Sequence, residues 1–458
     1  MSPSAVAVSA PGKVLFAGGF LVLDRKHTGL VFGLNARIHV HIEQWNPTLL
    51  DDVTGNFIFV QSPQFLDARW LYQVTQTSAE DRGVQVEQVQ SQVGFTTSAN
   101  KFVETTLRYG LTYISQTTKG VGGNVKITIL ADDDYYSQST RIVQRSGTAF
   151  SNFGVSLSDA HKTGLGSSAA LVTSLTGAML AFYSTKSGAD GSLPQQTVHN
   201  LAQAAHCAAQ GKVGSGFDVA AAVFGSCLYR RFTPTILEVV GEHTNPHFGK
   251  RLRMCVDDLE LEAKWDVEVA SHAVKIPNDL ILVMCDVDCG SETPGMVRKV
   301  LQWRKEKSDE ANLLWNALQQ GQEELCQELR RLAEVDRIGI QGCKDLGDII
   351  LTIRSLVREM SIKSEVPVEP PVITELLDYC TAMPGVVGGL APGAGGYDAV
   401  ALLIVNDGEV VQRLRDRLNG WKCSDKEGAT IGNVRLLGVK QANEGIRWEE
   451  IYQYGEWL

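Results

Sequence analysis

The chain has 458 residues, of which 44% are hydrophobic and 21% charged, and its formal net charge at pH 7 is -10. This length and composition predict two or three folded domains with a large buried core. Nucleic acids and anionic membranes both attract basic surfaces, so the acidic balance argues against either as a partner. A small anionic substrate remains compatible with it, because a few lysines and backbone N–H groups suffice to hold a phosphate.

The cysteines and the apolar segments predict the compartment. Nine cysteines are scattered along the chain without a Cys-x-x-Cys pair, which is typical of reduced, mostly buried thiols. The first residues lack the basic and apolar regions of a secretory signal, and no stretch approaches 18 uninterrupted apolar residues. We therefore expect a cytoplasmic protein without a membrane span. The oligomeric state, monomer or homodimer, stays open.

The N-terminal residues predict strands. Short strands at 6–8 and 14–16 flank a turn, and residues 36–42 alternate between apolar and polar side chains. Such alternation is typical of a half-buried strand in an antiparallel sheet. We therefore expect His39 and His41 on a solvated strand face rather than as metal ligands.

The middle of the chain changes from strand patterns to helical ones. Residues 45–100 are poorly periodic and rich in Gln, Ser and Thr, which indicates a hairpin and an irregular insertion. The apolar spacing after them predicts one strand and then three helices, the last of which is short, buried and ended by a glycine. These lie at 125–129, 167–182, 198–209 and 219–224.

The second half mixes helices and strands without strict alternation. A buried strand opens it and the other elements follow, at 280–285, 294–320, 322–335, 343–361, 372–382, 385–390, 399–405 and 408–419. This mixture favours an α+β fold. We place the boundary near residue 270, which gives domains at 1–270 and 271–458.

Several glycine-rich segments are candidate binding loops. The first, Ala10-Pro-Gly-Lys13, sits between two predicted strands, and an ordinary turn with a solvated lysine explains it equally well. Residues 392–398, the third glycine loop, have four small residues before a strand, so a ligand can lie against bare backbone, although a plain hairpin loop has the same composition. Residues 210–218, the acceptor loop, carry Lys212 and Asp218 into the short helix, where an Asp also suits a helix N-cap.

The second segment, residues 162–170, is the phosphate loop, and it runs directly into a predicted helix. Its glycines allow close backbone approach, and the free N–H groups and positive end of the helix form an anion site. The loop lacks the Gly-Lys-Ser/Thr ending of a Walker A motif, and the polar residues before it argue against a dinucleotide-binding fold. A helix N-cap at Ser167 or Ser168 is the alternative that needs no ligand.

Taken in order, these loops resemble those of the GHMP kinases, which include galactokinase, homoserine kinase, mevalonate kinase and phosphomevalonate kinase. The Gly-Leu-Gly-Ser-Ser-Ala-Ala run of the phosphate loop is the most specific part of the match. Residues 9–23, 210–221 and 290–293 look most like the eukaryotic-type phosphomevalonate kinases. The resemblance covers most of the chain and is weakest at about 45–100 and 235–270.

The resemblance implies a fold and a reaction. The expected fold is that of a GHMP kinase, with an N-terminal domain like domain 2 of ribosomal protein S5 and a C-terminal ferredoxin-like domain. The expected reaction uses ATP and Mg2+ to convert (R)-5-phosphomevalonate to (R)-5-diphosphomevalonate, in the mevalonate route to isoprenoids and sterols.

The resemblance also assigns roles by position. It makes Lys13, Ser168 and Asp218 catalytic and brings Ser168 to the metal. It implies that the ATP phosphates lie on Lys162, Thr163, Gly164, Leu165, Gly166, Ser167, Ser168 and Ala169. It implies that the acceptor faces Lys13, Gly19, Lys212, Ser215, Asp218, Ser291, Gly393, Ala394, Gly395 and Gly396.

The sequence departs from the superfamily pattern at one place. Mevalonate kinase and galactokinase carry a Glu, a magnesium ligand, upstream of the catalytic Asp, whereas the residues around Gln210 offer no carboxylate. The metal is therefore expected on Ser168, phosphates and water. A phosphomonoester has a second pKa of about 6, so its oxygen is already largely deprotonated at pH 7. We therefore predict that Asp218 orients Lys13 or the metal shell rather than acting as a general base.

Two other functions fit the same residues. Mevalonate kinase differs only in an acceptor that lacks the phosphate, and the cationic loop around Lys212 favours the phosphorylated acceptor. A catalytically silent ligand sensor on the same fold would be favoured by loss of Lys13, Ser168 or Asp218, and all three are present.

Overall fold

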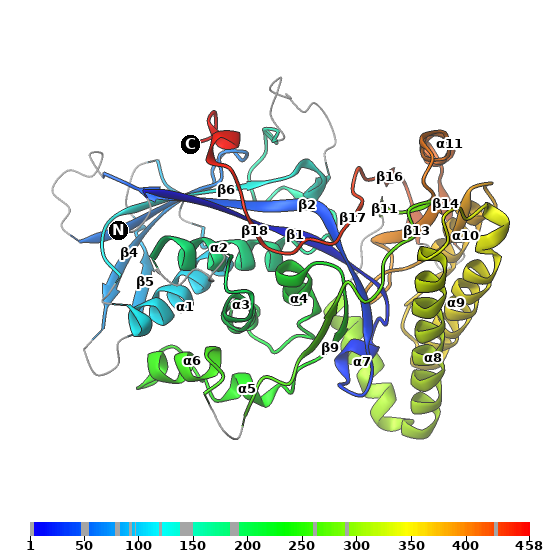
Figure 1. Cartoon of the computed structure of the whole chain (residues 1–458), viewed down its shortest axis with the longest axis horizontal. Helices are drawn as coiled ribbons and strands as arrows, with labels where there is room; N and C mark the ends of the chain where they lie inside the picture. Colours follow the sequence, from blue (N-terminus) through cyan, green and yellow to red (C-terminus); the bar gives the residue numbers. More distant parts are fainter. Residues whose placement is uncertain are drawn as a thin grey trace.

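The computed structural model describes residues 4–46, 55–77, 83–90, 94–96, 98–118, 121–137, 150–183, 192–259, 263–288, 293–425 and 429–458. Figure 1 shows two units side by side, a large twisted sheet over a layer of helices and a smaller sheet flanked by the long helices α8 and α9. Helices and strands are mixed without regular alternation, as predicted for an α+β fold.

The first sheet has the strand order β10-β9-β2-β6-β3-β4-β5, and β1 pairs with both β2 and β18. Within the region predicted as a hairpin and an irregular insertion, β3 and β4 form an antiparallel hairpin to which β5 is added. The strands are β1 Ala5–Ala17, β2 Gly29–Gln44, β3 Asn56–Gln61, β4 Arg69–Gln76, β5 Val84–Gln88, β6 Val125–Ala131, β9 Cys227–Arg230, β10 Glu268–Ser271, β17 Gln441–Ala442 and β18 Arg447–Trp448.

The N-terminal segment differs from its prediction. Residues 6–8 and 14–16 belong to one continuous strand, β1, which pairs with β2 along its length and is irregular in register between Pro11 and Lys13. The expected turn is therefore a bulge. A bulge re-aims side chains without ending a strand, and here it carries Lys13.

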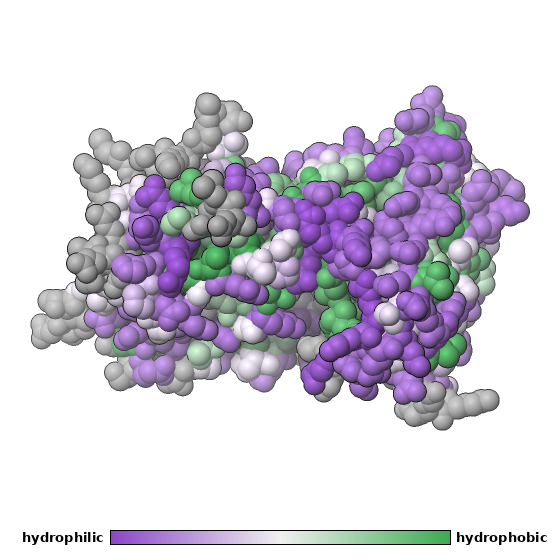
Figure 2. All heavy atoms as spheres, turned by 90° about the horizontal axis from the view of Figure 1, so that it is seen from below, coloured by the Kyte–Doolittle hydropathy of each residue, from purple (hydrophilic) through white to green (hydrophobic). Residues whose placement is uncertain are grey.

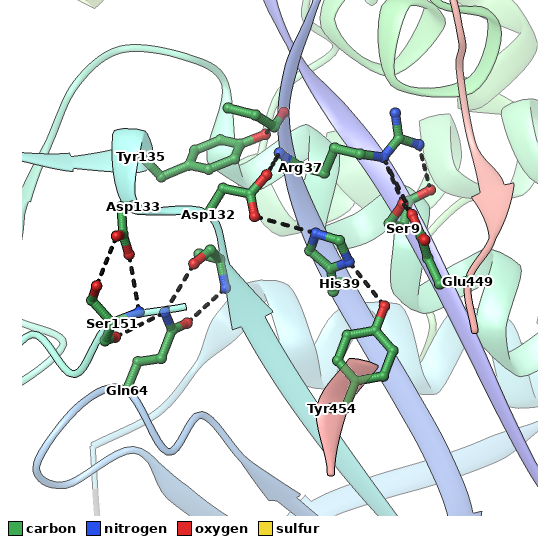
Figure 3. A network of polar contacts seen from close by, with 12 residues as sticks. Ser9, Arg37, His39, Gln64, Asp132, Asp133, Tyr135, Ser151, Glu449 and Tyr454 are labelled. Carbon is green, nitrogen blue, oxygen red and sulfur yellow. Dashed lines mark hydrogen bonds and ion pairs between the residues drawn. The ribbon is translucent and has the colours of Figure 1, made fainter. Parts of the chain in front are cut away.

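The polar face of β2 is buried, so the prediction of a solvated face was wrong. Arg37, His39 and His41 are 4%, 7% and 2% exposed. The C-terminal residues cover them, with His39 Nδ1 2.9 Å from the Tyr454 hydroxyl and Arg37 Nη2 donating to the Gly445 carbonyl at 2.6 Å. Figure 3 shows His39 between Tyr454 and Asp132, and the Arg37 side chain directed at Ser9 and Glu449. Because the covering residues come more than 400 positions later, the local pattern could not reveal them.

Helices α1, α2 and α4 pack on the other face of the first sheet, and α3 packs against these three helices (Figure 1). Asn100 caps α1 by accepting from the Val103 N–H, and Gly211 ends α3 in the left-handed conformation, with φ 69°. α2 is buried nearly all round, as its apolar composition dictates. The helices of this unit are α1 Lys101–Thr117, α2 Ser167–Tyr183, α3 Gln195–Gln210, α4 Phe217–Phe224, α5 Thr235–Glu238 and α6 Phe248–Val256.

The second unit has the ferredoxin-like strand order β12-β13-β11-β16, with all pairs antiparallel. The side chains of β11 face two different cores, which explains why residues 280–285 are all apolar. Leu282 and Met284 belong to the main core, whereas Ile281, Val283 and Cys285 pack in a second core with α10 and α11. The strands are β11 Leu280–Val287, β12 Val386–Leu390, β13 Ala399–Val405 and β16 Val434–Leu436, beside the small pairs β7 Tyr136–Ser137 with β8 His161–Lys162, and β14 Cys423–Ser424 with β15 Thr430–Ile431.

The long helices break at a different place from the one predicted. The first helix ends at Glu306, because Lys307 leaves the helical conformation with φ -123° and ψ 51°. The predicted break near residue 321 lies instead inside α8, where a Cβ on Gly321 would lie 3.0 Å from Ile353 of α9. That glycine therefore serves helix packing. The helices are α7 Thr293–Glu306, α8 Ser308–Ala333, α9 Lys344–Ser364, α10 Pro371–Thr381 and α11 Gly408–Leu418.

The end of the chain returns to the first sheet. β17 pairs with β2, and β18 pairs with β1, after the ferredoxin-like unit is complete. A boundary at residue 270 stays a prediction, to which this topology adds a C-terminal segment lying on the N-terminal sheet. The eight cysteines within the described segments are buried and unbonded, and no helix there is long and apolar enough to cross a bilayer.

Candidate active site

The bulge of β1 places Lys13 against the phosphate loop. Its backbone N–H donates to the Leu165 carbonyl at 2.9 Å, and its Nζ donates to the Gly164 carbonyl at 3.1 Å. Burial lowers the pKa of the Lys13 ammonium, and the Asp218 carboxylate partly opposes this. The lysine is therefore fixed at both ends, with its charge directed at the loop that the sequence assigned to phosphate.

The phosphate loop is anchored by hydrogen bonds at Thr163, whereas its next residue, Gly164, faces open space. Thr163 anchors it, donating its N–H to the Tyr135 carbonyl at 3.1 Å and its hydroxyl to the Asp134 carbonyl at 2.6 Å. Gly164 has φ +75° and nothing within 4 Å of an added Cβ, so it faces open space. Gly166 has φ +82°, and its Cβ would lie 2.8 Å from Lys13 Cε. Only glycine meets both demands, the left-handed backbone and the close lysine.

Helix α2 begins at Ser167, directly after these glycines. Its first N–H groups have no partner within the helix, and the helix dipole adds positive potential there. A cavity of about 400 Å³ opens at this end, and both Ser167 and Ser168 line it together with Lys162. The cavity therefore adjoins the segment that the sequence predicts to hold the ATP phosphates.

A second cleft, of about 490 Å³, lies on the other side of the loop and brings together many of the predicted residues. Among its lining residues are Lys13, Gly164, Lys212, Ser215, Asp218, Gly393, Ala394 and Gly395. α7 contributes Val297 and Leu301 to one wall. Seen from the side of α5 to α7, the surface is mostly hydrophilic, with hydrophobic residues exposed near its middle (Figure 2).

The side chains of Arg231 and Tyr229 hold the acceptor loop, residues 210–218, by hydrogen bonds to its backbone carbonyls. Arg231 donates from Nη1 to the Leu23 carbonyl at 3.0 Å and from Nη2 to the Gly214 carbonyl at 2.7 Å. The Tyr229 hydroxyl donates to the Ser215 carbonyl at 2.7 Å. Sequence reasoning missed Arg231, because its side chain reaches the loop only through the fold. The one signal was a charged residue at the end of a buried strand.

The third glycine loop joins the two units. The Gly393 N–H donates to the Leu15 carbonyl at 2.9 Å, and the Gly396 N–H donates to the Val368 carbonyl at 2.9 Å. Gly19 packs on this loop, since its Cβ would lie 2.0 Å from the Gly393 carbonyl oxygen. The structure therefore places Gly19 behind the third glycine loop, and its role toward the acceptor stays a prediction.

Ser291 and Ser168 are two further predicted site residues. Ser291 lies outside the described residues. Ser168 does lie at the site, where its Oγ is 3.1 Å from His206 Nε2, and His206 Nε2 is 3.3 Å from Gln210 Nε2. The sequence analysis noted that the residues around Gln210 offer no carboxylate, but it did not point to His206, which lies one helical turn before Gln210.

The described segments hold no group of three or more His, Cys, Asp or Glu side chains suited to a metal. Mg2+ keeps several waters and is held through one or two protein oxygens together with substrate phosphates. The Ser168 hydroxyl, beside the N-terminus of α2, fits this mode of binding.

The fold, with glycine-rich loops meeting around one cleft, defines a GHMP kinase, and the family model for the GHMP kinases N terminal domain matches residues 145–226. The solved Streptococcus pneumoniae phosphomevalonate kinase, in complex with phosphomevalonate and AMPPNP, has this fold, with a TM-score of 0.60 at 15% identity, and the match covers 95% of this chain and 100% of that one.

Full-length sequence comparison identifies the family to which the chain belongs within the GHMP kinases. The phosphomevalonate kinase of Aspergillus fumigatus is 47% identical over 488 residues, covering 100% of this chain and 99% of that protein. That of Gibberella zeae is 46% identical over 463 residues, covering 99% and 98%. The chain belongs to the phosphomevalonate kinase family.

Proposed function

We propose that this chain transfers the γ-phosphoryl group of ATP to the phosphate of (R)-5-phosphomevalonate, giving ADP and (R)-5-diphosphomevalonate. The observation that carries the proposal is the arrangement of one phosphate loop between two cavities. The nucleotide side opens at the N-terminus of α2, and the cleft on the other side is lined by Lys13, Lys212 and Arg231. The carboxylates of Asp218 and Asp398 also line this cleft, but the three cations outnumber them, and this balance suits an anionic acceptor.

Lys13 and the phosphate loop align the transferred group. Phosphoryl transfer depends on positioning and charge neutralisation rather than on covalent help from the protein. The phosphate loop offers backbone N–H groups, and Lys13 is held by two contacts to the same loop. Losing one such preorganised donor costs about 2.7–4 kcal/mol of transition-state stabilisation.

Mg2+, when bound, neutralises charge on the nucleotide phosphates, and Ser168 is the residue that we propose to hold it. The Asp218 carboxylate lies at the start of α4 and accepts from the Val219 N–H at 3.0 Å. Burial lowers the pKa of Lys13 and the Asp218 charge opposes that effect, so Asp218 favours the protonated lysine. The acceptor oxygen attacks as a phosphate oxygen, so no proton need pass to Asp218.

ADP release measured by a coupled assay tests the proposal. We expect turnover with Mg·ATP and 5-phosphomevalonate, and none with mevalonate at the same concentration. Turnover on mevalonate alone would contradict the proposal and would restore Asp218 as a general base.

A further inference from the structure

A buried histidine lies between the two cavities. His206 is 2% exposed and comes from the last turns of α3. Its ring stacks on Phe102 with centroids 5.7 Å apart and an interplanar angle of 30°, which fixes the plane of the ring. In that plane Nε2 lies 3.1 Å from Ser168 Oγ and 3.9 Å from the Asp218 carboxylate. The ring therefore touches the residue proposed for the metal and approaches the one proposed to govern Lys13.

The contacts of Nε2 define its role in the hydrogen bond. Gln210 approaches Nε2 with its amide nitrogen, at 3.3 Å. An amide nitrogen can only donate, so this contact requires the tautomer in which Nε2 carries its single acceptor lone pair. Ser168 Oγ, at 3.1 Å, lies closer to that lone pair than the Gln210 amide nitrogen, at 3.3 Å, so in this tautomer the Ser168 hydroxyl is the nearer donor.

This direction matters for the proposed metal ligand. A serine oxygen that binds a cation must present a lone pair to it, so its hydrogen must point elsewhere. We infer that His206 is a positioning residue, whose Nε2 accepts the Ser168 hydrogen and thereby turns the Ser168 lone pairs toward the Mg·ATP phosphates. The inference rests on the proposed function and deepens it: here a histidine orients the metal-binding hydroxyl without binding the metal.

Binding of the ATP analogue AMPPNP, measured by calorimetry with and without Mg2+, tests this independently of turnover. In His206→Leu we expect affinity for Mg·AMPPNP to fall about tenfold, the effect of one hydrogen bond near charge, while affinity without Mg2+ changes little. His206→Gln keeps a polar group near the Nε2 position and should recover at least half of that loss on a logarithmic scale. Equal weakening with and without Mg2+ would overturn the inference.

A double-mutant cycle separates positioning from simple packing. If His206 acts through Ser168, adding His206→Leu to Ser168→Ala should weaken Mg·AMPPNP binding by less than about twofold, because the hydroxyl is already gone. Fully additive losses would contradict the inference. His199 is the matched control, since it is also buried on α3 but packs against Phe224 and Trp265. His199→Leu should leave Mg·AMPPNP affinity unchanged.

The wild-type protein distinguishes the two proposals. If it binds Mg·AMPPNP but turns over no phosphomevalonate, the proposed function fails while the role of His206 can still be tested by binding. Should His206→Leu not fold, as monitored by thermal unfolding, the cycle is run with His206→Gln, for which we then expect a smaller but still non-additive loss. Additive losses in that cycle would overturn the inference.

Discussion

The phosphate loop and the third glycine loop line the same cleft but are built in opposite ways. The phosphate loop is anchored at Thr163 and contacted by Lys13, but an added Cβ on Gly164 would face open space, just before the N-terminus of α2. The third loop is pressed against protein, because a Cβ on Gly395 would lie 2.1 Å from the Val368 carbonyl oxygen. The same residue type therefore serves ligand approach in one loop and close packing in the other.

A buried ion pair supports the third glycine loop. Breaking this pair should cause the largest loss of unfolding free energy among the variants proposed here. Arg354 and Glu369 are both 1% exposed and lie 2.8 Å apart, next to the Val368 carbonyl that holds Gly396. Glu369→Gln removes the carboxylate that pairs with both Arg354 and Arg358 and leaves Asp378 as a charged partner of the buried Arg354, so we expect a loss of about 3–5 kcal/mol in unfolding free energy.

Urea unfolding measures that loss, and the acceptor KM should rise with it as the third loop loosens. Glu409→Gln removes one partner of the exposed pair with Arg413 and is the control, with an expected change of about 0–1 kcal/mol. Equal losses in the two variants would show that the third loop does not depend on its buried support.

Lys13 tests the other loop. Lys13→Met keeps the length of the side chain but removes the ammonium that contacts Gly164, so we expect kcat to fall about 10²–10³-fold with little change in unfolding temperature. Lys212→Met is the companion variant, on the acceptor loop. It should raise the KM for 5-phosphomevalonate more than the KM for ATP, and the reverse pattern would exchange the roles of the two lysines.

Gly166 of the phosphate loop and Gly395 of the third glycine loop both leave too little room for a side chain. Gly166→Val and Gly395→Val both place a side chain at positive φ, +82° and +71°, which costs roughly 1–3 kcal/mol in each. Beyond that shared cost, Gly166→Val should displace the flexible Lys13 and abolish ATP binding in a folded protein. Gly395→Val meets backbone and should lower the unfolding temperature further. ATP affinity of the wild-type value in Gly166→Val would refute the assignment of the phosphate loop.

The smallest expected effect is a shift in a pH profile. Lys13 works when protonated, so kcat/KM should fall as the pH rises through its pKa. Asp218 raises that pKa, so Asp218→Asn should lower it further and move the basic limb of the profile to lower pH. An Asp218→Asn enzyme that recovers activity at high pH would instead identify Asp218 as a general base.

Local patterns predict the parts of the candidate site that one segment builds. The glycines and serines of residues 162–170 predict an anion loop because the loop and its helix are contiguous. The same locality explains the success with α2, α4 and β11, whose apolar spacing directly reflects burial.

What escaped prediction depends on distant parts of the chain. Arg37 and His39 alternate with apolar residues as a solvated face would, and only Tyr454 and its neighbours bury them. Helical periodicity continues through Lys307, so the break there was not visible in the pattern. In the sequence His206 is one of several polar residues in an Ala-rich helix, and its contact with Ser168 becomes visible only in the folded structure.

A crystal structure with Mg2+, AMPPNP and 5-phosphomevalonate would test most directly the claim that the phosphate loop separates donor from acceptor. We predict the γ-phosphate between Ser168 and Lys13, and the acceptor phosphate in the cleft against Lys212, with its oxygen in line for transfer. An acceptor bound on the Ser167 side of the loop, or a γ-phosphate out of reach of Lys13, would contradict the account.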